Sequence, residues 1–77
     1  MTTSQLHLTL PDGLELERTV AALRTSLPVH LNIRRANVEE QSSWFIVELT
    51  GSDEEIERAV AWLGEQGVSV DRIPVDG

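Results

Sequence analysis

Residues 44–63 read WFIVELTGSDEEIERAVAWL and place a strand, a turn and a helix in immediate succession. From Trp44 to Thr50 the apolar residues fall on both faces of a period-two pattern, which is typical of a central strand covered on both sides. Gly51 ends this strand, and Ser52 followed three residues later by Glu55 is a capping box that predicts the start of a helix. The apolar stripe of that helix consists of Ile56, Ala59, Val60 and Leu63.

The sequence beyond this helix predicts one more strand. Gly67 stands where a glycine C-cap belongs, and Val68 is placed for the hydrophobic contact that accompanies such a cap. Val68, Val70 and Ile73 then form a short strand that ends before Pro74.

On the N-terminal side, Leu6, Leu8 and Leu10 alternate with polar residues and predict a half-buried strand. Asp12 followed by Glu15 predicts a second capping box. The stripe of the helix that would follow consists of Leu16, Val20, Leu23 and Leu27. Pro28 ends that helix, because the residue before a proline avoids the helical region.

The next strand changes phase along its length. Apolar residues alternate from Val29 to Ile33, and the pattern then slips by one residue to Ala36 and Val38. A slip of one residue would turn the buried face outward, so we expect a bulge near Arg34 and Arg35. The polar residues 39–43 predict a hairpin loop.

This order of elements predicts an α+β, ferredoxin-like βαββαβ fold, the split βαβ arrangement. Its four-stranded antiparallel sheet would have the order 4-1-3-2, with both helices on one face. Residues 1–77 would form a single domain with its core in residues 5–74.

Composition excludes several classes of function. The chain has no cysteine, and its net charge is −7. Residues 39–77 contain ten acidic residues and two arginines. Nucleic-acid binding needs a basic surface, so we expect none. The chain contains neither a signal-peptide pattern nor an apolar run long enough for membrane insertion, and we expect a cytoplasmic protein.

The residues that could support catalysis or bind a metal have simpler explanations. His7 and His30 would lie on strands separated by a third, roughly 10 Å apart at the usual strand spacing, which is too far for one shared zinc ion. The acids 53–55 compensate the dipole of the helix that they start. We therefore expect no enzyme activity, no metal and no cofactor.

The face of the sheet opposite the helices carries residues without a core role. Trp44 and Ile46 would form an apolar patch there, which predicts a homodimer interface. A half-exposed tryptophan without a partner is the alternative. Arg34 and Arg35 are either solvated charges that protect a sheet edge or contacts to an anionic group.

Several segments together resemble the NIL domain, the regulatory domain at the C-terminus of bacterial methionine-importer ATPases. They are residues 6–10 (LHLTL), 29–39 (VHLNIRRANVE), 47–51 (VELTG), 61–63 (AWL) and 67–68 (GV). The chain departs from the family pattern at Arg34, where the family usually has leucine, and at Ser42 and Ser43, where it often has Phe-Gly. The 77 residues contain no ATPase sequence, so we expect a free-standing copy of the domain.

The resemblance implies dimers that bind methionine near their interface and modulate an ABC transporter ATPase or a metabolic enzyme. Asn32 matches the asparagine implicated in ligand binding, and Phe45 matches an apolar position of the same site. With Ile33 and Trp44 they form the predicted ligand site, whose apolar walls favour an uncharged amino acid. Two alternatives stay open: Asn32 could bond the local backbone, and the domain could be a protein–protein interaction module without a small ligand.

Overall fold

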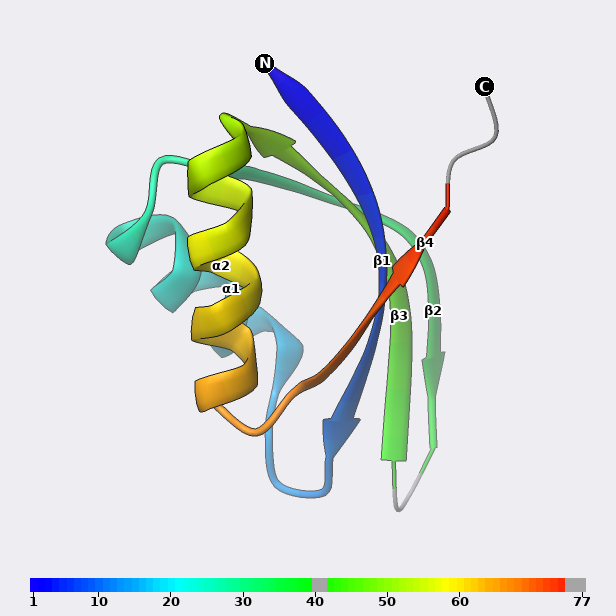
Figure 1. Ribbon diagram of the computed structural model, residues 1–77. Helices are drawn as coiled ribbons and strands as arrows, with labels where there is room; N and C mark the ends of the chain where they lie inside the picture. Colours follow the sequence, from blue (N-terminus) through cyan, green and yellow to red (C-terminus); the bar gives the residue numbers. More distant parts are fainter. Residues whose placement is uncertain (40–41, 75–77) are drawn as a thin grey trace.

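The computed structural model describes residues 1–39 and 42–74. Six elements follow one another along the chain: β1 (Thr2–Pro11), α1 (Leu16–Ser26), β2 (His30–Val38), β3 (Ser42–Gly51), α2 (Asp53–Glu65) and β4 (Ser69–Ile73). The strands form one antiparallel sheet in the order β2-β3-β1-β4, which is the predicted order read from the other edge. Both helices cover the same face, and the predicted ferredoxin-like fold is confirmed (Figure 1).

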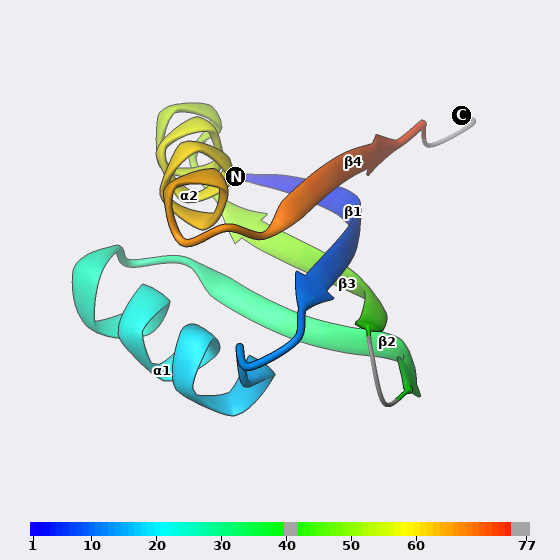
Figure 2. The same cartoon turned by 90° about the horizontal axis from the view of Figure 1, so that it is seen from below.

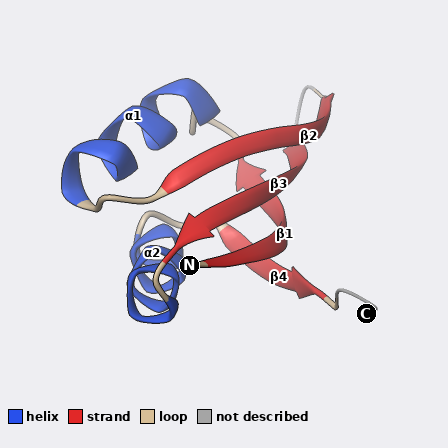
Figure 3. Ribbon diagram, turned by 90° about the horizontal axis from the view of Figure 1, so that it is seen from above, coloured by secondary structure: helices blue, strands red, loops and turns tan. Residues whose placement is uncertain are grey.

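The core lies between the sheet and the two helices, and it follows from the alternation of the strands. The helix-facing residues of β1 and β3 are buried, whereas their sequence neighbours on the other face are only partly covered. The largest fully buried side chains are Leu6, Leu8, Leu10, Leu23, Leu49, Leu63 and Val47. The two helices lie over different parts of the sheet, with α1 beside β2 and α2 near β1 (Figure 2, Figure 3).

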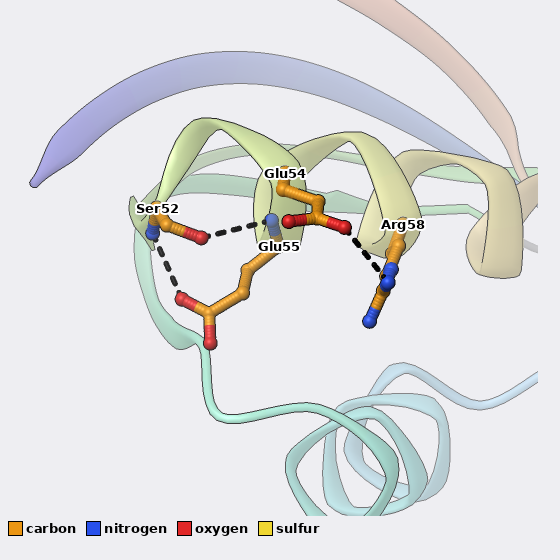
Figure 4. A network of polar contacts seen from close by, with 4 residues as sticks. All are labelled: Ser52, Glu54, Glu55 and Arg58. Atoms are coloured by element: carbon orange, nitrogen blue, oxygen red, sulfur yellow. Dashed lines mark hydrogen bonds and ion pairs between the residues drawn. The ribbon is translucent and has the colours of Figure 1, made fainter.

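The caps of α2 form as the sequence predicts. The Ser52 hydroxyl accepts a hydrogen bond from the Glu55 N–H at 3.1 Å, and the Ser52 N–H donates to Glu55 Oε1 at 2.9 Å (Figure 4). At the other end Gly67 has a φ of +93°, and the Val68 N–H donates to the Leu63 carbonyl at 3.1 Å. These are the bonds of a Schellman motif, with Val68 buried beneath it.

The start of α1 differs from the prediction. The helix begins at Leu16 with Glu15 as N-cap, and no side chain caps it. Asp12 and Gly13 instead form a turn, in which the Leu14 N–H donates to the Pro11 carbonyl at 3.2 Å and Gly13 adopts a φ of +92°. The Asp12–Glu15 capping box was therefore wrong, because the glycine between the two acids favours a tight turn over a helix start.

Strand β2 contains the predicted irregularity. Its register against β3 shifts between Ile33 and Arg35. The predicted hairpin loop was too long, because β3 begins at Ser42, opposite Pro11 of the central strand β1. Two residues of the predicted loop lie outside the described residues, Glu40 and Gln41.

The capping box makes stability depend on pH. The pKa of Glu55 lies below its ordinary value of 4.5, first because the Ser52 N–H donates to its carboxylate, then because of the Ser52 side chain and the Arg58 charge. A carboxyl with a lowered folded-state pKa stabilises the fold above the unfolded pKa and loses this effect as pH falls through the folded pKa.

We expect the stability advantage of wild type over Glu55→Gln to shrink as pH falls below about 4.5. Urea unfolding between neutral and acidic pH measures it, with Glu65→Gln as control. A constant difference would contradict the assignment.

Candidate functional site

The open face of the sheet carries two of the predicted ligand residues, Asn32 and Trp44. Trp44 stacks on His7, with ring centroids 5.4 Å apart and an angle of 23° between the planes. His7 Nδ1 lies 3.9 Å from Asp71 Oδ2 on β4. The imidazole covers one side of the indole, and Trp44 and Ile46 are each only partly exposed. The predicted apolar patch of Trp44 and Ile46 therefore borders His7, which pairs with Ile46 across the strands.

Asn32 lies on this same open face, exposed and opposite Glu48 of β3. Glu48 forms an ion pair with Arg34, whose Nη1 lies 3.0 Å from Glu48 Oε1. Arg34 follows Asn32 by two positions, so strand alternation places it on the open face. The arginine that departs from the family pattern thus has a partner on this face.

Ile33 and Phe45 lie on the opposite face, toward the helices. Phe45 pairs with Leu8 of β1, and Ile33 pairs with Val47, both of which are core residues. Neighbouring residues of a strand point to opposite sides of a sheet. Within one copy of the chain, the structure brings Ile33 and Phe45 together and separates them from Asn32 and Trp44.

A groove lies between the start of α1 and the strands β2 and β3, and we call it the β2 groove. Its volume is about 410 Å³. It is lined by Leu14, Glu15, Leu16, Glu17, Ile33, Val38, Ser43 and Phe45. Leu14 and Leu16 were not predicted as site residues, because Leu14 lies inside the predicted capping box and Leu16 was assigned to the apolar stripe of the helix. Val38 could have been predicted as a site residue, since the phase slip after Ile33 already places it on the same face of the sheet as Ile33.

The β2 groove exists because the helix layer leaves part of β2 uncovered. Ile33 and Val38 point toward that layer, yet 46% and 76% of their surfaces are exposed, more than those of the other large hydrophobic residues in the described segments except Met1. A row of core-facing residues thus continues past the edge of the core and ends in an open apolar slot.

A second groove lies next to the first along α1, and we call it the α1 groove. It has a volume of about 250 Å³ and is lined by Leu16, Glu17, Val20, Ala21, Arg24 and Ile33. Three residues, Leu16, Glu17 and Ile33, line both grooves. The two grooves are therefore neighbours beside α1 and β2, and most of the residues that line them are apolar.

Comparisons with known proteins identify both the fold and a family. A family model described as the NIL domain matches residues 5–72. None of the helices in the described segments is both long and apolar enough to cross a membrane. No curated protein shows significant sequence similarity to the chain.

Two solved structures share the architecture. The first is the C-terminal domain of an ABC transporter ATP-binding protein from Enterococcus faecalis, with a TM-score of 0.76 and 15% identity over 95% of this chain and 86% of that one. The second is a de novo designed protein, Foldit4, with a TM-score of 0.55 and 13% identity over 96% of this chain and 97% of that one. At such identities the likeness establishes the fold alone.

Proposed function

The chain belongs to the NIL domain family, and from this we propose that it is a non-catalytic regulatory domain that binds an uncharged, apolar amino acid. Methionine is the first candidate, as the resemblance to the regulatory domains of methionine importers implies. The transporter ATP-binding protein whose C-terminal domain shares this fold supports an ABC transporter ATPase as the target of regulation.

The observation that carries the proposal is the β2 groove. Its volume of about 410 Å³ lies within the usual range for small-molecule sites, about 300–1,000 Å³. Two apolar side chains that face the core layer, Ile33 and Val38, lie open to water there. An apolar ligand side chain that covers them would gain the free energy of removing this surface from water. Ser43 supplies a hydroxyl at the same site.

Thermal unfolding with a panel of amino acids tests the proposal, because a ligand that binds only the folded state raises its melting temperature. We expect methionine, leucine or another apolar amino acid to give the largest increase. Glutamate should give none, since Glu15 and Glu17 line the groove. Lysine is the informative competitor, because these carboxylates attract its charge while the apolar walls reject it. A larger shift with lysine or glutamate than with methionine would contradict the assignment.

Two neighbouring residues on opposite faces give a matched pair of variants. Ile33→Asn alters the β2 groove, whereas Asn32→Ala alters the open face. If the ligand occupies the groove, Ile33→Asn should abolish the ligand-induced shift and Asn32→Ala should retain it. The reverse result would support the sequence-based prediction that Asn32 is the ligand anchor. No shift with any amino acid in the wild-type protein would overturn the proposed function.

Self-association through the open face is a second candidate function, supported by the partly exposed Trp44 and Ile46 on that face. We expect Trp44→Ala to weaken a homodimer and to leave the fold intact, because the indole stacks on His7 of the open face and lies outside the core. Sedimentation over a range of micromolar concentrations measures the dimer. Trp62→Ala, on α2, is the control for loss of an indole elsewhere. A single 8.6 kDa species for the wild type would exclude the homodimer.

A further inference from the structure

We propose that Glu17 and Arg24 clamp the charged head of a free α-amino acid in the α1 groove, with its apolar side chain extending into the β2 groove. The carboxylate of Glu17 would bind the ammonium group, and the guanidinium of Arg24 would bind the carboxylate. This inference rests on the proposed function and assigns the residues that distinguish an amino acid from other apolar molecules.

Glu17 lies where the two grooves meet, because it lines both. Its neighbour Glu15 has a partner in Arg18, whose Nε lies 3.6 Å from Glu15 Oε2. Glu17 has no ion pair or side-chain hydrogen bond within residues 1–39 and 42–74. The junction of the grooves therefore carries a carboxylate whose charge is available to a ligand cation.

Arg24 lies at the far end of the α1 groove, and among the described residues it is the cation that lines either groove. Its Nη2 donates to the Leu31 carbonyl at 3.4 Å, which places the guanidinium beside the edge of β2. A guanidinium has five N–H donors, so most of them are available for a ligand carboxylate.

The spacing of these two residues suits a zwitterion. They are seven positions apart on α1, so their side chains leave the same face of the helix about 10.5 Å apart along its axis. The ammonium and carboxylate groups of an α-amino acid share one carbon atom, and a charge-assisted hydrogen bond of about 2.8 Å at each end extends this span. The flexible side chains of glutamate and arginine cover the remaining distance. The ligand side chain would then pass Ile33, which lines both grooves.

Helix stabilisation is the competing explanation, since Glu17 lies in the first turn of α1 and Arg24 in its last turn. Charges in these positions interact favourably with the helix dipole. A purely structural role predicts lower stability of the ligand-free variants and an unchanged preference among ligands. A clamp predicts that each variant loses the preference for one charged group of the ligand.

Calorimetry on the full chain distinguishes these roles with three probes: L-methionine, L-methioninamide, which lacks the carboxylate, and the hydroxy analogue of methionine, which lacks the ammonium. We expect wild type to bind methionine roughly two- to fivefold more tightly than either analogue, the effect of one charge pair at a solvent-exposed site. Glu17→Gln should weaken methionine and methioninamide and spare the hydroxy analogue. Arg24→Gln should weaken methionine and the hydroxy analogue and spare methioninamide, while Arg24→Lys retains most of the affinity.

Arg58→Gln and Glu54→Gln serve as controls, because each removes a charge from a residue of α2 that lines neither groove. The clamp is overturned if methionine binds and the Glu17 and Arg24 variants behave like these controls, or if either variant weakens all three probes equally. In both cases the proposed amino-acid site still stands. If none of the three probes binds the wild-type protein, the proposed methionine site and the clamp fail together.

Discussion

Leu63→Ala is expected to lower the free energy of unfolding by about 2–5 kcal/mol, the usual cost of truncating a fully buried leucine. Leu63 is 1% exposed, and its side chain packs in the core between α2 and the sheet. The total stability of a domain of this length is about 4–12 kcal/mol, so the variant would lose a large part of it. We expect the melting temperature to fall by more than about 10 °C.

Chemical denaturation with linear extrapolation measures this loss. Leu63→Met is the matched control, because it keeps the volume of the side chain and should cost less than about 1.5 kcal/mol. Both variants leave the backbone bond from the Val68 N–H to residue 63 in place, so the difference between them reports the cavity. A cost below about 1 kcal/mol for Leu63→Ala would show that the core closes around the missing atoms.

Phe45→Ala is expected to destabilise the protein by about 3 kcal/mol and to abolish the ligand-induced rise in melting temperature. The stability effect lies at the low end of the range for phenylalanine truncation, because the ring borders the open β2 groove. Phe45 is 7% exposed and belongs to the core, yet it also lines the β2 groove. Its loss would therefore remove part of the core and one wall of the proposed site together.

Phe45→Leu separates these two effects. Leucine keeps the position apolar and buried, and we expect a modest loss of stability together with a reduced ligand response. Thermal unfolding of both variants with and without methionine provides the measurement. If methionine raised the melting temperature of Phe45→Ala as much as that of the wild type, the β2 groove would be excluded as the site.

The fold could be predicted because its strongest signals are local. The alternation of Leu6, Leu8 and Leu10, the capping box at Ser52 and the glycine at position 67 each specify backbone geometry over a few residues. The phase slip after Ile33 even located the irregularity of β2. The start of α1 was predicted wrongly, because two local signals compete there. The spacing of Asp12 and Glu15 predicted a capping box, but the chain forms a turn at Gly13.

The groove that we propose as the ligand site could not be predicted in this way, because its geometry depends on how far a helix stands from a strand. Ile33 and Phe45 share a face, as strand alternation requires, but no pattern in the sequence states that α1 leaves them a groove. The sequence-based site combined residues that are adjacent along the chain, Asn32 with Ile33 and Trp44 with Phe45. A strand directs such neighbours to opposite sides.

The position of β1 in the centre of the sheet has a consequence for how the protein assembles during synthesis. Its pairs with β4 join Thr9 to Ser69 and Gln5 to Ile73, contacts that span 60 and 68 positions. Such distant contacts carry a loop-closure cost that slows folding. Strand β1 is made well before β4 and therefore receives this neighbour only when the chain has been made to Ile73. A strand made early is therefore completed late. Until β4 has been made and has paired, one edge of β1 stays open to other chains.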